Sequence, residues 1–249
     1  FPNPLIEKQF GDDTMPKTGD NVAIEYGVTR EDADTFAAAS QAKYEAAKQA
    51  GFFAGEIVGV EVSQGRKLPP KMVELDEHPR PSSNLEALQK LRPLFEGGVV
   101  TAGNASGVND GAAALIIGSK AAQEKLGIQP IAKILSSAAA GIEPRIMGAG
   151  PVDAIKLALK RANLSLEQMD VIEINEAFAS QVLACLKGLD IAFDDARVNP
   201  NGGAIAVGHP LGASGARLAL STARELQRSG KKYAVISLCI GVGQGLAMV

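Results

Sequence analysis

Apolar and polar positions are arranged differently in the two halves of the chain. In the first half, residues 29–51 predict a long helix, with Thr29 placed to cap its start and Gly51 just beyond its end. Residues 56–62 alternate like a strand, while residues 63–98 are polar and proline-rich, which is typical of an irregular surface segment. This half therefore predicts an α+β region with little regular structure.

The second half alternates between apolar strands and amphipathic helices. We expect strands at 132–141, 169–174, 233–240 and 245–249, the last two forming a hairpin, and helices at 151–164, 175–189 and 212–230. Such alternation predicts a layered α/β domain over residues 127–249.

Composition and charge exclude several classes of protein. The 249 residues include 25 basic and 28 acidic side chains, which gives a net charge of −3. No basic stripe indicates a nucleic-acid partner, and no apolar run reaches the roughly 18 residues of a membrane span. The two cysteines, Cys185 and Cys239, lie far apart and predict neither a disulfide framework nor a zinc site, which favours a reducing, cytoplasmic compartment.

Four stretches place polar or reactive side chains where strands end or helices begin. "INEAF" puts Asn175 after a buried strand, and "GHPLGASG" puts His209 before a helix. "CIGVGQG" puts Cys239 at the start of a turn that contains Gly241, and "TAGNASGVNDG" puts Ser106 in a loop of small residues. Ligands of α/β folds gather at such strand ends and helix starts, so these stretches are candidates for one site.

Each stretch also has a purely structural interpretation. A strand cysteine is commonly a small buried apolar residue, an asparagine at a helix start is commonly a cap, and a glycine-rich turn is commonly only a turn. His209 is the most distinctive, because Gly208 and Pro210 restrict its backbone. A thiol, a histidine and bare backbone N–H groups together suit acyl transfer or carbon–carbon chemistry beside a thioester. They do not suit phosphoryl transfer, which requires Lys, Arg and a metal site.

"NEAF", "GHPLGASGAR" and "CIGVGQG", in this order after "GNASGVNDGAA", resemble the thiolase family, and the resemblance extends to "MPKTGDNVA" and "TREDADTFAAASQ". It implies an enzyme that cleaves 3-ketoacyl-CoA with coenzyme A, or runs the reverse Claisen condensation. The implied fold has two similar layered α/β domains with a loop domain over the active site. Coenzyme A and acyl-CoA would be substrates, with no permanently bound cofactor and no metal, in a homodimer or homotetramer.

The resemblance also implies roles for individual residues. His209 resembles the base that activates a nucleophilic cysteine and faces a thioester oxygen, and Asn175 the residue that holds a water in one oxyanion hole. Cys239 resembles the cysteine that moves a proton to or from the α-carbon, and the N–H of Gly241 a donor in the other oxyanion hole. Residues expected to contact the pantetheine and acyl groups or the CoA nucleotide are Ser106, Ala102, Met15, Phe178 and Arg80.

The chain departs from the family at its N-terminal side. Both ends are interpreted as cut ends, and most of the N-terminal domain is expected to be missing. On this interpretation residues 1–98 are part of the loop domain, residues 99–126 the last strand and helix of the N-terminal domain, and residues 127–249 the C-terminal domain. Cys185 is expected in the core, so neither cysteine matches the nucleophile and the chain alone is expected to be inactive.

Three functions remain open at the level of sequence. The first is a degradative thiolase, with "NPLIEKQFGDDTMPKTGDNVA" and "VNPNGG" favouring branches such as the 3-oxoadipyl-CoA thiolases. The second is a non-catalytic thiolase-like protein that binds acyl-CoA or a partner, which retention of Asn175, His209 and Cys239 argues against. The third is a ketoacyl synthase, but those enzymes use two histidines with one cysteine and lack a second cysteine in such a turn.

Overall fold

The computed structural model describes residues 3–249, and its centre is a four-stranded sheet. The strands lie in the order β3(Ser137–Gly141), β6(Gln244–Met248), β5(Ala234–Ile240) and β4(Val171–Ile174). β5 and β6 form the predicted antiparallel hairpin, β3 pairs antiparallel with β6, and β4 runs parallel to β5. Two parallel strands therefore end at the same edge of the sheet, where Asn175 and Cys239 were expected to meet.

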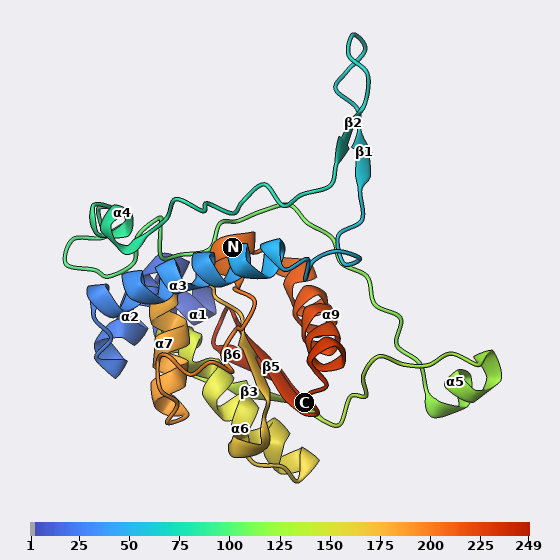
Figure 1. The fold of residues 1–249 in the computed structure, drawn as a ribbon. Coiled ribbons are helices and arrows are strands. Elements are labelled where there is room, and N and C mark those ends of the chain that lie inside the picture. The colour runs from blue at the N-terminus through green and yellow to red at the C-terminus, as the bar shows by residue number, and fades with distance from the viewer. Residues whose placement is uncertain (1–2) are drawn as a thin grey trace.

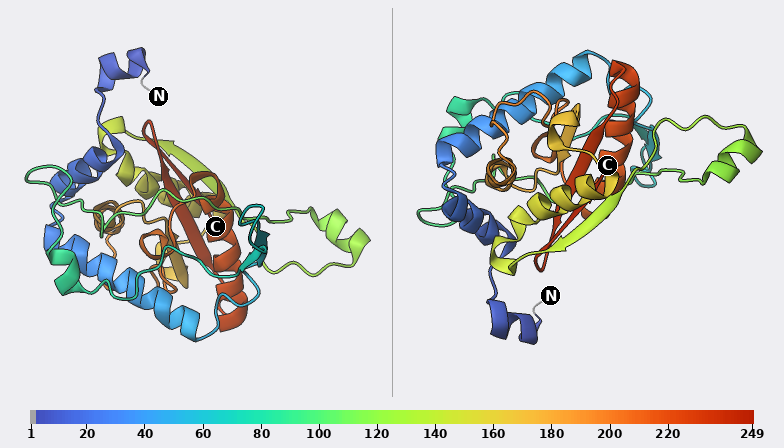
Figure 2. Two further views of the ribbon diagram at one scale, coloured as in Figure 1. Left: turned by 90° about the horizontal axis from the view of Figure 1, so that it is seen from above. Right: turned by 90° about the horizontal axis from the view of Figure 1, so that it is seen from below.

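Helices cover both faces of this sheet. α6(Gly150–Ala162) packs against β3, β5 and β6, whereas α9(Leu211–Ser229) packs against β4 and β5. Figure 2 shows the sheet between α9 on one side and α6 with α7(Ala179–Gly188) on the other. Fully buried aliphatic side chains such as Ile155 and Ile172 fill the space between the layers. The predicted layered α/β architecture is confirmed.

Helices from the first half of the chain lie against this layered unit. α2(Met15–Tyr26) contacts α7 and the 3₁₀ segment η1(Pro144–Ala149). α3(Arg30–Gln49), the helix predicted over residues 29–51, contacts α7 and the short helix α8(Ala204–Val207). Helix α2 was not predicted, because it buries polar side chains in addition to apolar ones and so lacks a clear apolar stripe; its buried polar residues are Thr18, Asp20 and Asn21.

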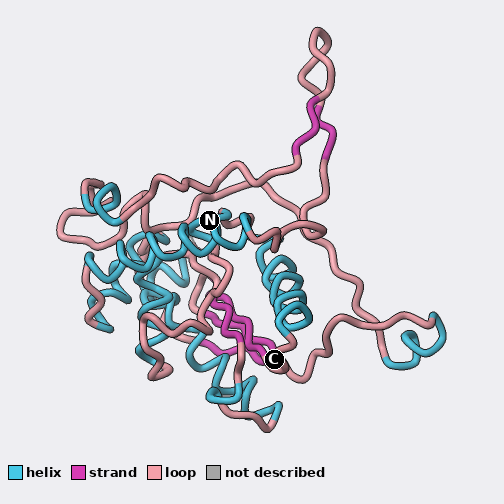
Figure 3. Tube along the Cα trace, in the orientation of Figure 1, coloured by secondary structure: helices cyan, strands magenta, loops and turns pink. Residues whose placement is uncertain are grey.

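Between α3 and β3 the chain is mostly loop, as Figure 3 shows. A small antiparallel hairpin of β1(Val60–Val62) and β2(Lys71–Val73) projects from the body, and α5(Lys120–Leu126) lies at the tip of a second excursion (Figure 1). The strand predicted over residues 56–62 is shorter than expected, because only Val60–Val62 form β1. The remaining short elements are α1(Pro4–Phe10), α4(Leu85–Gln89) and η2(Leu166–Gln168).

The expectation of a last strand and helix within residues 99–126 is half right. The helix forms as α5, but the apolar run "AALIIGS" at residues 113–119 forms no strand, and Ile116 is 100% exposed. A strand needs a neighbour to share its backbone hydrogen bonds, and within residues 3–249 no strand pairs with this run.

Two other predicted elements begin later than expected. The strand predicted over 132–141 starts at Ser137, and the helix predicted over 175–189 starts at Ala179. Phe178, directly before that helix, has extended backbone angles. Residues 175–178 therefore form a connection between β4 and α7, which leaves the side chain of Asn175 free to face a site.

Candidate active site

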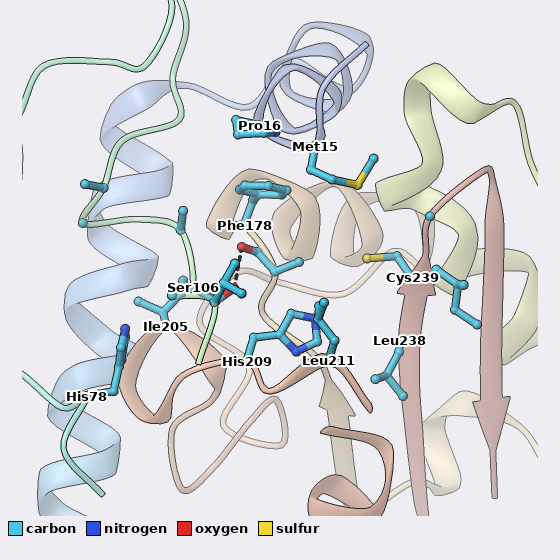
Figure 4. A pocket seen from close by; sticks show the side chains of 18 of the residues that line it. Met15, Pro16, His78, Ser106, Phe178, Ile205, His209, Leu211, Leu238 and Cys239 are labelled. Carbon is cyan, nitrogen blue, oxygen red and sulfur yellow. Dashed lines mark hydrogen bonds between the residues drawn. The ribbon is translucent and has the colours of Figure 1, made fainter. Parts of the chain in front are cut away.

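A cavity of about 860 Å³ lies where the ends of β4 and β5 meet the N-terminal helices and the loop around residue 106. All of the predicted site residues except Asn175 line it: Met15, Arg80, Ala102, Ser106, Phe178, His209, Cys239 and Gly241. In Figure 4 the side chains of Met15, Phe178, His209 and Cys239 surround the same space. Residues separated by more than two hundred positions along the chain are thus brought to one site, as the motifs predicted.

His209 is held at both its backbone and its ring. Gly208 before it has φ +93°, a conformation that favours glycine, and turns the chain toward the loop at residues 107–109. The N–H of His209 donates to Gly107 O at 3.1 Å and to Asn109 Oδ1 at 3.2 Å. Its ring Nδ1 lies 2.6 Å from Ser214 Oγ. These contacts fix the direction of the imidazole in the cavity wall.

The other ring nitrogen of His209 faces Asn175. Asn175 Nδ2 lies 3.3 Å from His209 Nε2, and Asn175 is itself buried with its backbone N–H bonded to Ser237 O of β5. Asn175 thus contacts His209, although it is not one of the residues that line the cavity. Its Oδ1 is buried and has no hydrogen-bond partner among the described residues, so it is available to accept from a bound water or ligand.

Burial shifts the pKa values of His209 and Cys239. Desolvation, with a smaller contribution from the positive charge of Arg217, lowers the pKa of His209, which favours the neutral imidazole that can accept a proton. Burial raises the pKa of Cys239 to about 12, so its thiol stays protonated at neutral pH. A neutral base and a protonated thiol in one cavity suit proton transfer in opposite directions.

Cys239 lies near the end of β5, where it pairs with Gly245 of β6. The turn that follows contains Val242 at φ +72° and Gly243 at φ +90°, so the backbone of this turn departs from strand geometry directly after the thiol. Gly241 lines the cavity in this turn. The other cysteine, Cys185, is fully buried and donates to Gly148 O at 3.3 Å, which confirms its expected place in the core.

Glu176, beside Asn175, is a structural residue. Its fully buried carboxylate accepts from the hydroxyl of Ser40 in α3, from Asn199 Nδ2 and from the N–H of Ile205. Desolvation raises its pKa, and these hydrogen bonds act in the opposite direction. Glu176 therefore ties α3, the turn after β4 and the segment that leads to His209 into one unit.

The loop with Ala102 and Ser106 is fixed to the turn after β4. The N–H of Ser106 donates to Ala177 O at 3.0 Å, its hydroxyl donates to the same oxygen at 3.2 Å, and Ala105 pairs with Phe178. Arg80 enters the cavity wall from the irregular segment, with its backbone N–H bonded to Gln41 Oε1 at 3.0 Å.

Sequence reasoning missed three residues of the site. His78 and Gln41 line the cavity, and His78 Nδ1 lies 2.9 Å from Ala206 O. Ser214 lies against the ring of His209. "EHPR" was interpreted as part of a surface segment, and Gln41 lies in a helix without a motif. The serine of "GHPLGASG" follows His209 at a spacing that brings it back to the ring, and this spacing was the available signal.

The described residues contain no group of three or more His, Cys, Asp or Glu side chains placed to hold a metal ion. Within the same part of the chain, no helix is both long and apolar enough to cross a membrane. The groups that the site itself presents are the imidazole of His209, the thiol of Cys239, the amide of Asn175 and the turn that contains Gly241.

Comparison with known proteins defines the class. Residues 3–121 match the family described as thiolase, N-terminal domain, and residues 128–249 match thiolase, C-terminal domain. The chain therefore belongs to the thiolase family. The expectation that the N-terminal domain is largely missing is wrong as stated, because nearly half of the chain matches that domain.

Individual proteins within this family are also similar to the chain. The chain is 56% identical to the beta-ketoadipyl-CoA thiolase of Acinetobacter baylyi over 250 residues, which cover 100% of the chain and 62% of the relative. Its fold is similar to a crystal structure of the Bacillus anthracis acetyl-CoA acetyltransferase, with a TM-score of 0.91, 42% identity and coverage of 94% of this chain and 59% of the other. Human mitochondrial 3-ketoacyl-CoA thiolase in complex with CoA gives a TM-score of 0.86 at 47% identity, covering 94% and 57%. The chain thus spans less than two thirds of the length of these proteins.

Proposed function

We propose that this chain carries the proton-transfer and oxyanion-binding half of a thiolase that cleaves 3-ketoacyl-CoA with coenzyme A, or runs the reverse condensation. The observation that carries the proposal is that His209 and the Cys239 thiol line one cavity while Asn175 contacts the ring of His209. The names of the relatives, which include a beta-ketoadipyl-CoA thiolase at 56% identity, support this reaction. They also favour a 3-oxoadipyl-type substrate, as "NPLIEKQFGDDTMPKTGDNVA" and "VNPNGG" indicated.

In the cleavage direction a thiolate adds to the 3-keto carbon of the substrate, and the bond between the α-carbon and this carbon then breaks. His209 accepts the proton of the attacking thiol at Nε2 and then faces the thioester oxygen. A water held by Asn175 Oδ1 donates to the same oxygen as it becomes negative in the enolate. Cys239 gives its proton to the α-carbon, which releases acetyl-CoA and leaves an acyl group on the attacking thiol.

In the second half of the reaction the CoA thiol gives its proton to the Cys239 thiolate and attacks the acyl group, and the first thiol leaves and takes back the proton held by His209. The N–H of Gly241 would stabilise the oxyanion that forms when the CoA thiol attacks the acyl thioester. Ser106, Ala102, Met15 and Phe178 would contact the pantetheine arm and acyl chain. Arg80 is the candidate for the nucleotide end, since an arginine suits phosphate. The relative solved with CoA supports a CoA thioester in such a cavity.

Neither cysteine of the chain fits the attacking thiol. Cys185 is buried in the core, and Cys239 matches the acid/base cysteine. We therefore expect the 249-residue chain alone to perform no thiolysis. Detection of acetoacetyl-CoA thiolysis by the purified chain would contradict this expectation. The division into residues 1–98, 99–126 and 127–249, the homodimer or homotetramer and the cytoplasmic location are parts of the same proposal.

The role of Cys239 can be tested in an enzyme assembled from this chain and the part of the Acinetobacter relative that it does not cover. We expect Cys239→Ala to slow carbon–carbon bond formation by roughly 10²- to 10⁴-fold, the range of a lost general acid/base. Acyl-enzyme formation, measured as a burst of CoA release from acetyl-CoA, should change far less, because it needs no proton at the α-carbon.

Cys185→Ala is the matched control, because it removes the other thiol without touching the cavity. Equal losses in both half-reactions of Cys239→Ala would refute the assigned role. The alternative function, a non-catalytic protein that binds acyl-CoA, predicts a different result. The assembled protein would then bind acetyl-CoA but would release no CoA from it.

A further inference from the structure

We propose that Ser214 is a positioning residue that holds the neutral ring of His209 with its proton on Nδ1 and its free electron pair on Nε2. The inference rests on the proposed function only in taking His209 as the base; the tautomer itself is a property of the chain. Ser214 lies in the first turns of α9 and is fully buried. Its Oγ is 2.6 Å from His209 Nδ1, a short contact for a neutral pair.

The opposite side of the ring determines which nitrogen carries the proton. At 3.3 Å from His209 Nε2 lies the amide nitrogen of Asn175, which has only protons to offer. With the Asn175 amide in this orientation Nε2 accepts, and Nδ1 of the neutral ring then carries the hydrogen and donates it to Ser214 Oγ. The direction matters because only a nitrogen with a free electron pair can take a proton from a thiol.

The backbone of His209 is fixed independently of the ring. Its N–H lies between Gly107 O and Asn109 Oδ1, and Gly208 is in close contact with the Asn109 side chain, where a Cβ would collide. With the Cα held in this way, rotation about the side-chain bonds is the remaining freedom of His209. Ser214 restricts that rotation, since turning the ring over would break the contact at Nδ1.

The surroundings of His209 contain few charges that would compete with this arrangement. Arg217, also on α9, opposes a positive imidazolium, and the Cys239 thiol on the same cavity is protonated. From the loop of residues 107–111 the nearest side chain is the neutral Asn109, and from the end of β4 it is the neutral Asn175. A hydrogen bond, rather than a neighbouring carboxylate, therefore selects the tautomer.

The chain contains only two histidines, which makes the tautomer directly measurable. The probe is the pair of ring ¹⁵N chemical shifts of the 249-residue chain labelled at histidine, recorded above the pKa of the ring. His78→Asn assigns the signals. His78 is also an internal reference, because its Nδ1 faces the carbonyl of Ala206, which can only accept.

In the wild-type chain we expect His209 in the Nδ1–H form. Ser214→Ala should lower the ratio of the Nδ1–H to the Nε2–H form by about 2- to 10-fold, the effect of losing one neutral hydrogen bond. Ser214→Thr keeps a hydroxyl and should restore the ratio. Ser221→Ala is the matched control, because it removes another buried hydroxyl of α9 that bonds to Glu56.

A wild-type His209 in the Nε2–H form would overturn the proposal, as would a ratio that Ser214→Ala leaves unchanged. Equal shifts in Ser214→Ala and Ser221→Ala would also overturn it, because they would reflect a general loosening of α9. No substrate is used, so these outcomes are independent of whether the thiolase reaction itself is correct.

Discussion

Two apolar segments of similar composition have opposite environments in this molecule. All four residues of β4, "VIEI", are buried, and Ile172 and Ile174 are 0% exposed. In the run "AALIIGS" at residues 113–119, Ile116 is 100% and Ile117 is 74% exposed. β4 has a parallel neighbour in β5 and α9 packed against it, whereas the second run has no strand partner within the described residues. Burial of an apolar strand is thus decided by its partners and not by its composition.

The candidate site is built on the buried, paired elements, as β4 is, and not on the exposed run. Asn175 follows β4, Cys239 lies near the end of β5 and His209 precedes α9, so all three are carried by the layered unit. The loop with Ser106 is attached to the same unit through Ala177, and the attachment continues as far as Gly111, which packs closely on Pro210. The chain then runs out to α5, which lies away from the body in Figure 1. The candidate catalytic side chains are therefore held in place by the layered unit, whereas the neighbouring apolar segment has no such support.

The largest test of the comparison is truncation of the buried isoleucine. Ile172→Ala should lower the free energy of unfolding by about 2–5 kcal/mol, because it removes a fully buried side chain and leaves a cavity in the core. The change is measured by urea unfolding of the 249-residue chain followed by circular dichroism. The matched variant Ile116→Ala removes the same atoms from an exposed site and should have a far smaller effect. Similar losses in the two variants would break the comparison.

The layered unit is also the part of the fold that could be predicted from the sequence. Its strands and helices follow from strong apolar periodicity, and the motifs around Asn175, His209 and Cys239 lie at strand ends where a parallel arrangement brings them together. The start of α7 was misplaced because "NEAF" continues the chain beyond β4 in extended form before the helix begins. That error moved no site residue, since the strand end itself was correctly placed.

What could not be predicted depends on long-range contacts. Helix α2 buries Asp20, whose carboxylate accepts from the backbone N–H groups of Val99 and Val100, a partner that no local pattern reveals. His78 reaches the cavity from an irregular segment because Ala206 O fixes its ring. A strand was expected within residues 99–126 because they resemble the last strand and helix of the N-terminal domain, but the run at 113–119 has no strand partner among the described residues.

A smaller effect is expected from the one carboxylate within β4. Burial raises the pKa of Glu173 to about 8 from 4.5, with Arg217 and Lys43 opposing the shift and Glu176 and Glu225 adding to it. A carboxyl whose folded pKa lies above its unfolded value is favoured in its neutral form, so its contribution to stability is lost as pH rises from 4.5 to 8. Glu173→Gln should therefore raise the free energy of unfolding, relative to wild type, on the order of a few kcal/mol more at pH 8 than at pH 5.

The pH dependence should differ between buried β4 and the exposed excursion that carries α5. Glu124→Gln is the control, because Glu124 lies on the exposed helix α5 with 67% of its side chain accessible. We expect Glu124→Gln to change the free energy of unfolding by no more than about 0.5 kcal/mol at either pH, as is usual for an exposed surface substitution. If Glu173→Gln also has a pH-independent effect, the carboxylate of Glu173 is solvated in solution and β4 is less completely buried than the structure indicates.

The smallest effect is expected where an apolar side chain is replaced by a charge in the exposed run. Ile116→Lys should change the free energy of unfolding of the 249-residue chain by no more than about 0.5 kcal/mol, since a side chain that is 100% exposed loses no burial. The same change should reduce self-association measured by analytical ultracentrifugation, because an exposed apolar segment whose backbone groups are unpaired can pair with another chain. Destabilisation of several kcal/mol would mean that Ile116 is buried in solution, and the contrast between this run and β4 would then fail. An unchanged stability combined with weaker association would locate the difference between the two segments in their partners.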